Sequence, residues 1–176
     1  MKEFPKFLSQ CQNYCGGAQV MITKSFSTSR IFGQVAISAG FKGSGVTRFI
    51  DYPDYWLLVN HQKSSYSTRF YINVAILYKE LLTCNFSEDD IKTIYKNNAT
   101  IWPHVTFRLE SCPALSPSLK EDMDKFVEEQ DEDGLTATLK HGLTALLNFV
   151  EHNHGRQNIR KLNDERKLTA TLTKEV

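Results

Sequence analysis

The sequence lacks the features that would assign it at once to several large classes of protein. No segment approaches the roughly 20 consecutive apolar residues that span a bilayer. Its 21 basic and 20 acidic side chains nearly cancel, to a formal net charge of +1. Proteins that grip phosphate backbones carry a net basic footprint instead. We therefore expect no membrane association and no nucleic acid as the main partner.

Cysteine is also scarce, and the four cysteines do not form a metal-binding pattern. Cys11 and Cys15 are close together, but a zinc site needs a second cysteine pair or paired histidines at matching spacing. His152 and His154 cannot share a helix face at their spacing, and no H-E-x-x-H motif occurs. We expect no metal and no cofactor. Reduced thiols fit a cytoplasmic protein, because disulfides rarely persist in that compartment.

The length of 176 residues is typical of a single domain. Residues 1–20 lack the apolar core of a signal peptide, which again favours the cytoplasm, and we interpret them as an N-terminal appendage. Residues 21–155 contain the regular patterns of one α+β domain. Residues 156–176 are charged with sparse apolar positions, so they predict either a partner-binding helix or a frayed tail.

Apolar periodicity and turn residues predict the α+β class. A helix over residues 24–39 should end at Gly40, because glycine reaches the left-handed conformation of a C-cap at little cost. Segregated strands with hairpin-type links predict a four-stranded antiparallel meander with helices packed on one face, followed by C-terminal helices. The expected strands cover residues 46–52, 55–62, 69–78 and 101–110, and further helices are expected over 86–98, from Ser118, and after a break at 131–134.

Alternation along the strands assigns their side chains to two faces of this sheet. The face under the helices should carry Phe70, Ile72, Val74, Val105, Phe107 and Leu109. The opposite face should carry a polar patch of predicted binding residues, namely Asn60, Gln62, Tyr71, Asn73, Trp102, His104, Thr106 and Arg108, with Lys63 and Arg69 near its rim. A specific site needs such groups on rigid strands. The alternative is an ordinary solvated face, although Trp56, Trp102 and Tyr71 would be costly to leave bare there.

Short segments in the middle of the chain resemble a bacterial family. They are Gly40-Phe41, Arg48-Phe49, and residues 59–64, 69–74 and 103–109. Their order and spacing are similar to those of a domain of unknown function in the 4304 series, which small stand-alone cytosolic proteins carry. The resemblance covers roughly residues 24–112 and implies a fold but no activity. Its members look like the single-domain immunity proteins found beside secreted toxins, an analogy that supports function only weakly.

No catalytic signature is complete in this sequence. His104 is the best candidate for acid–base chemistry, because the ordinary pKa of histidine lies near neutrality, but no orienting carboxylate is evident beside it. The glycines between Gly40 and Gly45 do not have the arrangement of a phosphate-binding loop. These observations favour a protein that is not an enzyme.

Two functions are therefore open. The first is a protein-binding module, most concretely an immunity-type inhibitor of a toxin encoded nearby. The acidic segment 121–133 would suit a basic toxin, although such segments are usually solvated surface. The second is a small-molecule or nucleotide-binding protein, or an enzyme, that uses the polar face around His104 and Arg108, because guanidinium pairs with phosphate and carboxylate oxygens. Homodimerisation through the same face is a third possibility.

Overall fold

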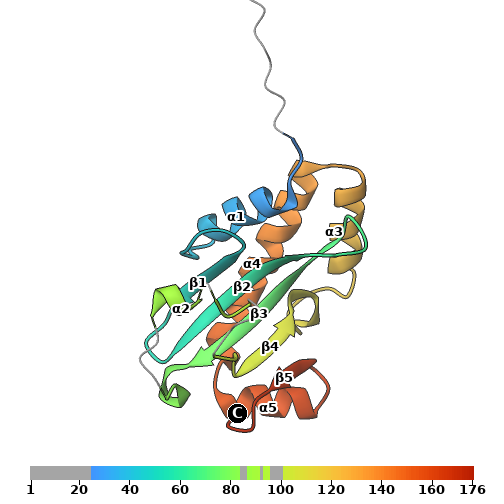
Figure 1. Cartoon of the computed structure of the whole chain (residues 1–176). Helices are drawn as coiled ribbons and strands as arrows, with labels where there is room; N and C mark the ends of the chain where they lie inside the picture. Colours follow the sequence, from blue (N-terminus) through green and yellow to red (C-terminus); the bar gives the residue numbers. More distant parts are fainter. Residues whose placement is uncertain (1–24, 84–86, 92, 96–100) are drawn as a thin grey trace, which may run out of the picture.

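The computed structural model describes residues 25–83, 87–91, 93–95 and 101–176, which form a mixed helix and sheet fold (Figure 1). The helices are α1 (Thr28–Ser38), α2 (Glu88–Ile91), α3 (Leu119–Glu128), α4 (Glu132–Asn153) and α5 (Arg156–Asp164), with short 3-10 helices η1 (Lys79–Leu81) and η2 (Leu109–Ser111). The strands are β1 (Thr47–Asp51), β2 (Tyr55–Lys63), β3 (Phe70–Tyr78), β4 (Val105–Arg108) and β5 (Ala170–Leu172). The predicted appendage, residues 1–20, lies outside the described residues.

The strands form one antiparallel sheet in the order β1-β2-β3-β4-β5. Asn73 lies opposite Asn60 on one side and Arg108 on the other, which confirms the register predicted from alternation. The prediction of four strands is wrong by one, because β5 pairs with β4. The C-terminal segment thus forms a helix and a strand, and it buries Ile159 and Leu168 in the main hydrophobic core.

Two predicted elements are shorter in the structure. The strand expected over residues 101–110 is regular only as β4, because Pro103 has no backbone N–H to donate and Leu109 already begins η2. The helix expected over residues 86–98 is described only as α2, and residues 86, 92 and 96–98 lie outside the described part. Its predicted start is confirmed, because the backbone N–H of Ser87 donates to the carboxylate of Asp90 at 2.8 Å.

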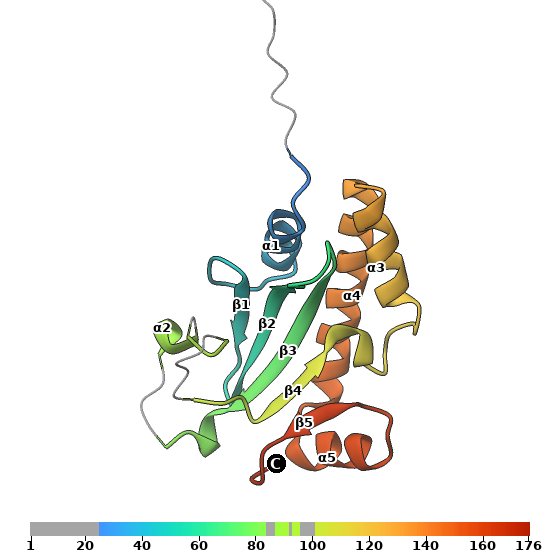
Figure 2. The same cartoon turned by 45° about the vertical axis from the view of Figure 1, so that its right-hand side comes forward.

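Hydrophobic clusters occupy both faces of the sheet. The main core lies on the face that carries Phe70, Ile72 and Val74, and α1, α3 and α4 contribute to it. On the opposite face, Ile91 of α2 packs in a second cluster, whose other buried members are Phe49, Trp56, Leu58, Ala75, Leu77 and Ile94. Figure 2 shows the sheet between α2 on one side and α3 and α4 on the other. The prediction that helices cover one face is therefore incomplete. Trp56, which would be costly to leave bare on this face, is 7% exposed.

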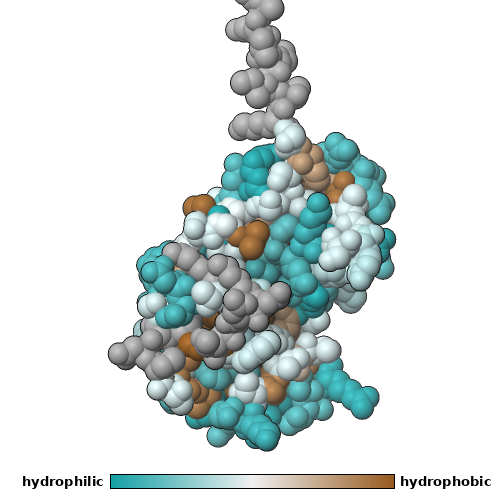
Figure 3. Space-filling model, in the orientation of Figure 1, coloured by the Kyte–Doolittle hydropathy of each residue, from teal (hydrophilic) through white to brown (hydrophobic). Residues whose placement is uncertain are grey.

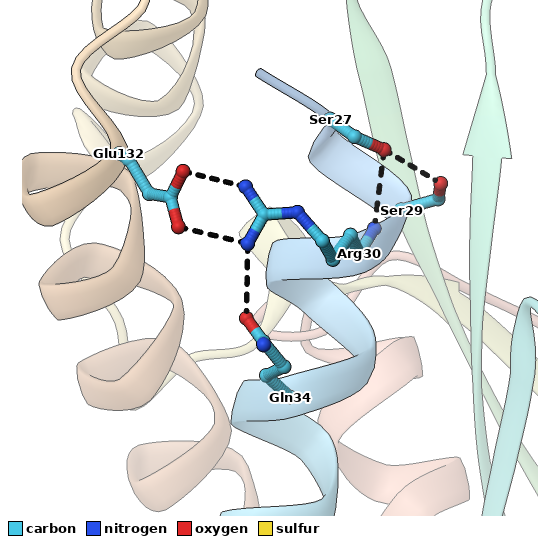
Figure 4. Close-up of polar contacts among 5 residues, drawn as sticks. All are labelled: Ser27, Ser29, Arg30, Gln34 and Glu132. Carbon is cyan, nitrogen blue, oxygen red and sulfur yellow. Dashed lines mark hydrogen bonds and ion pairs between the residues drawn. The ribbon is translucent and has the colours of Figure 1, made fainter. Parts of the chain in front are cut away.

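An ion pair joins the start of α1 to the start of α4. The Arg30 guanidinium donates to both carboxylate oxygens of Glu132, at 2.9 and 2.5 Å (Figure 4). The Ser27 hydroxyl accepts from the backbone N–H of Arg30 and caps the helix. A bidentate arginine–carboxylate pair fixes orientation as well as distance, so it holds α1 at a defined position over the sheet.

Gly40 ends α1 as predicted. Its N–H donates to the Ile37 carbonyl and the N–H of Phe41 donates to the Ala36 carbonyl, both at 3.0 Å, which is the bonding pattern of a Schellman motif. Gly40 has φ +93°, a value that L-residues rarely adopt, and Phe41 is buried against the core. Directly afterwards Lys42 exchanges two backbone hydrogen bonds with Phe49, at 2.7 and 3.1 Å, along the outer edge of β1.

Replacing Gly40 with alanine should lower the free energy of unfolding by about 1 kcal/mol. The cause is the backbone alone, because a Cβ at this position meets nothing within 4 Å. Urea denaturation of the purified variant measures the change. Gly40→Asn is the matched control and should lose less, since asparagine tolerates the left-handed conformation better. Equal losses in both variants would contradict this explanation.

Candidate functional site

The sheet face opposite the main core carries the second cluster at one end and polar side chains from neighbouring strands at the other. We call it the polar face and define it by Asn60, Gln62, Tyr71, Asn73, Thr106 and Arg108. Asn73 Nδ2 donates to Gln62 Oε1 at 2.9 Å and to Asn60 Oδ1 at 3.4 Å, and Asn60 Nδ2 donates to Thr47 Oγ1 at 2.9 Å. These bonds hold the amides in place. They leave Asn73 Oδ1 and Gln62 Nε2 to contact a ligand.

Arg108 packs against an aromatic ring on this face. Its guanidinium carbon lies 4.3 Å from the centroid of the Tyr71 ring, and Lys120 Nζ lies 4.8 Å from the same centroid. Such cation–π contacts position a guanidinium without using its N–H donors. Lys120 also forms an ion pair with Asp124, whose carboxylate is 3.5 Å from Arg69 Nε. The predicted rim residue Arg69 is therefore linked to the polar face through α3.

A hollow of about 630 Å³ opens beside Arg108. Its wall comes from β2, β3, β4, β5 and the segments next to them, and consists of Gln62, Asn73, Ile94, Tyr95, Trp102, Pro103, Thr106, Phe107, Arg108, Ser111, Thr169, Ala170, Thr171 and Thr173. Trp102, whose indole is 75% exposed, is part of this wall. Figure 3 shows this side of the molecule, where apolar residues form separate patches among polar ones. Of the residues predicted for binding, Gln62, Asn73, Trp102 and Arg108 thus line one concave part of the surface.

Among the described residues, the polar atoms that are buried in the wall of the hollow without a hydrogen-bond partner include Arg108 Nη1 and the Tyr95 hydroxyl. Leaving a buried donor unpaired costs about 1–3 kcal/mol, and more for a charged group. Burial raises the pKa of the Tyr95 phenol, and the positive charge of Arg108 opposes part of that rise in pKa. The phenol therefore stays neutral and can donate a hydrogen bond to an acceptor in the hollow.

Sequence reasoning missed the part of the wall that comes from distant segments. Tyr95 follows α2, and β5 brings Thr171 opposite Thr106 at the edge of the sheet. A signal for β5 exists in the sequence, because Thr169, Thr171 and Thr173 alternate with apolar residues. No corresponding local signal marks Tyr95 as part of a wall, since its position depends on how the segment folds over the sheet.

His104 does not join the other predicted residues. Its Nδ1 accepts a hydrogen bond from the backbone N–H of Tyr78 at 2.9 Å, its ring stacks on the Tyr78 ring, and it is 7% exposed. Burial lowers the pKa of His104, although the negative charge of Glu175 opposes that shift. A histidine whose Nδ1 is already occupied holds the end of β3 to the segment before β4, which is a structural role.

The two buried histidines, His61 and His104, should make the free energy of unfolding depend on pH. Burial lowers the pKa of both His104 and His61 in the folded chain. The unfolded chain therefore binds more protons below the ordinary histidine pKa of about 6.5, so the free energy of unfolding should fall from pH 7 to pH 5. Urea titrations at a series of pH values measure the change. His104→Asn keeps an acceptor near the Nδ1 position without a titrating group, and it should show a smaller fall. An equal fall in wild type and variant would contradict the role of His104.

The acidic segment predicted as a charged surface is partly engaged within the protein. Glu132 pairs with Arg30, and the Asp131 carboxylate accepts from the backbone N–H of Gly134 at 2.9 Å and caps α4. Glu121, Asp122, Glu128, Glu129 and Asp133 are exposed. Two of these exposed carboxylates also have partners within the protein, because Asp122 accepts from the Ser118 hydroxyl at 3.2 Å and Glu128 lies 4.0 Å from Arg69.

The described residues contain no group of three or more His, Cys, Asp or Glu side chains placed to hold a metal ion. Cys11 and Cys15 lie outside them, whereas Cys112 is a buried free thiol. In the part of the chain that the structure describes, no helix combines the length and apolar character needed to cross a membrane.

Comparison with known proteins identifies the family. The model of the domain of unknown function DUF4304 matches residues 32–148, which is more than half of the chain. The protein therefore belongs to this family. The matched region begins in α1 and ends in α4, so it includes β1 to β4 but not β5. No curated protein and no solved structure matches the chain significantly.

Proposed function

We propose that the protein is a non-catalytic module that binds a partner protein through the polar face and its hollow. The observation that carries this proposal is the exposed Trp102 beside a hollow that also contains Arg108. Tryptophan, tyrosine and arginine supply most of the energetic centres of protein interfaces, and all three occur here, because Tyr71 stacks on Arg108. An indole that is 75% exposed also gains from being covered by a partner.

The partner we propose is a bacterial toxin that the protein inhibits in the manner of an immunity protein, in the cytoplasm of the producing cell. The exposed carboxylates between Glu121 and Asp133 support this choice, because they complement a basic surface such as that of a nucleic-acid-cleaving toxin. Exposed charges of this kind mainly accelerate association. The side chains of the polar face and hollow would then supply the lasting contacts.

Trp102→Ala should weaken the complex with the toxin encoded beside this gene by roughly thirtyfold in Kd, the effect of losing about 2 kcal/mol. Arg108→Gln should weaken it similarly, and calorimetric titration of the two purified proteins measures both. Tyr66→Ala is the matched control, because Tyr66 is 99% exposed but is not part of the hollow, and it should leave Kd unchanged.

The proposal of toxin binding fails if no product of the neighbouring genes forms a stoichiometric complex with the wild-type chain. Trp102→Ala should unfold at nearly the wild-type urea concentration, because removing an exposed side chain changes stability by less than about 0.5 kcal/mol. Light scattering of the chain alone identifies the remaining case, in which the polar face binds a second copy of the same protein.

The hollow also favours a second candidate function, binding of a small molecule or nucleotide. Its volume of about 630 Å³ lies within the roughly 300–1,000 Å³ of typical ligand pockets. Arg108 Nη1 and the Tyr95 hydroxyl are buried donors without a partner in the part of the chain that the structure describes, and both suit the oxygens of a phosphate or carboxylate. Asn73 Oδ1 and Gln62 Nε2 add one acceptor and one donor beside them.

Tyr95→Phe separates this second function from the first. Removing a buried unpaired hydroxyl should leave the free protein equally stable or stabilise it by up to about 1 kcal/mol. The same change should weaken binding of a phosphorylated or carboxylated ligand about tenfold, because the bound ligand loses one hydrogen bond. Thermal unfolding against a panel of nucleotides and carboxylates measures both effects. A panel that shifts neither wild type nor variant contradicts a small-molecule site.

A further inference from the structure

A second cavity, of about 310 Å³, opens where the chain passes from α4 into α5. Its volume is at the lower end of the roughly 300–1,000 Å³ of typical ligand pockets, so it suits a small ligand. The start of β2, the end of β3 and the start of α5 contribute to its wall. We call it the α5 cavity and define it by Asp54, Tyr55, Tyr78, His154, Gly155 and Arg156, none of which lines the hollow beside Arg108.

The first turn of α5 presents backbone N–H groups to which the described residues offer no acceptor. They belong to Arg156, Gln157 and Asn158, whereas the N–H of Ile159 donates to the Gly155 carbonyl at 3.0 Å. Gly155 is the N-cap, and it lacks the side-chain oxygen with which serine, aspartate or asparagine would accept from them. Its φ of −59° is open to any residue, and an added Cβ would meet only Asn158 Nδ2, at 3.9 Å. Neither the backbone nor packing therefore requires glycine here.

The charges at this helix start favour an anion. The first turn of α5 contains no acidic residue, and Arg156 is its first residue. The positive end of the helix dipole thus lies beside a second positive charge, an arrangement that a negative group would stabilise. Arg156 Nε is paired with the Glu80 carboxylate at 3.1 Å, which leaves the backbone N–H groups available to a ligand.

A buried hydroxyl in the wall also lacks a partner. Tyr55 is 4% exposed, and its ring stacks on the His154 imidazole with 4.7 Å between the centroids. In the described part of the chain its hydroxyl has no hydrogen-bond partner, whereas the Tyr78 hydroxyl donates to the His154 carbonyl at 2.7 Å. The Tyr55 oxygen is not among the polar atoms sealed from solvent, and Tyr55 lines the α5 cavity. A ligand in the cavity can therefore reach this hydroxyl.

An acidic side chain lies near the same phenol. Burial raises the pKa of the Tyr55 phenol, and the negative charge of Asp54 is among the further causes of this rise in pKa. Asp54 is exposed, and its carboxylate has no ion pair or hydrogen bond among the described residues. Lys79, another charged residue of the wall, is paired with Asp51 at 2.7 Å. The cavity thus combines donors that suit an anion with a carboxylate that suits a cation.

We propose that the α5 cavity binds a free α-amino acid. Its carboxylate would accept from the N–H groups in the first turn of α5, and its ammonium group would pair with the Asp54 carboxylate. The Tyr55 hydroxyl can donate or accept, so it suits either end of the ligand. A simple anion or a simple cation would leave one of these groups without a partner. This inference is independent of the hollow and of the functions proposed for it.

An NMR titration tests the cavity. The probes are the common L-amino acids, each added at millimolar concentration to the 15N-labelled full chain. For the amino acid with the largest effect, the control probes are its N-acetyl derivative, which lacks the ammonium group, and its amide, which lacks the carboxylate. We expect saturable shifts of the backbone N–H signals of Arg156, Gln157 and Asn158 with a Kd in the millimolar range or below. Each control probe should bind at least tenfold more weakly.

Variants decide whether the response belongs to this cavity. Gly155→Asp supplies the missing cap from within the chain, so it should raise the urea concentration at the midpoint of unfolding and abolish the response to the amino acid. Asp54→Asn changes an exposed residue, so folding is not at risk, and it should weaken binding at least tenfold. Arg108→Gln, in the hollow, is the matched control and should leave the response intact.

Three results would overturn the proposal. One is that no amino acid shifts the signals of the first turn of α5. Another is that the N-acetyl derivative or the amide binds as tightly as the free amino acid, which would leave one of the two charges without a role. The third is an unchanged response in Gly155→Asp or in Asp54→Asn, which would place binding elsewhere.

Discussion

The pairing of β2 with β3 is the constraint on which the rest of the structure depends. It joins Tyr55 to Tyr78 and continues without interruption to Lys63 and Phe70. A shift of one residue would exchange the two faces of both strands. The core on one face, the second cluster and the polar face all follow from this single register. The position of Arg108 follows as well, because β4 is placed by its pairing with Asn73 and the residues after it.

Alternation predicted the register well because one face of β3 must be buried. Phe70, Ile72 and Val74 leave no ambiguity about which face that is. The same reasoning failed for β2, where Tyr55 to His61 are all buried. A strand buried on both faces shows a nearly continuous apolar run, and the run that includes Trp56 and Leu58 indicated a covering element on the second face. The prediction treated this run as one-sided and therefore missed the second cluster.

The remaining differences have a non-local cause. β5 has three residues and is held by its pairing with β4 more than sixty positions earlier in the chain. Local propensity is too weak to define so short a strand. The sequence singled out His104 for its chemistry, but its neighbours decide its role. The backbone N–H of Tyr78 donates to its Nδ1, and the Tyr78 ring stacks on its imidazole. Residue type thus indicated which groups have suitable chemistry, and only the fold decided which of them line the hollow.

The bridge between Lys42 and Phe49 has a consequence for how other chains can associate with this protein. Open strand edges invite another backbone to extend the sheet, which leads to uncontrolled self-assembly. Here Lys42 occupies the outer edge of β1 at Phe49, and on β5 the N–H of Ala170 is taken by the Asn163 side chain. Both margins of the sheet are thereby obstructed. A chain that associated with this protein would therefore meet side chains, which select among partners far more sharply than a backbone template does.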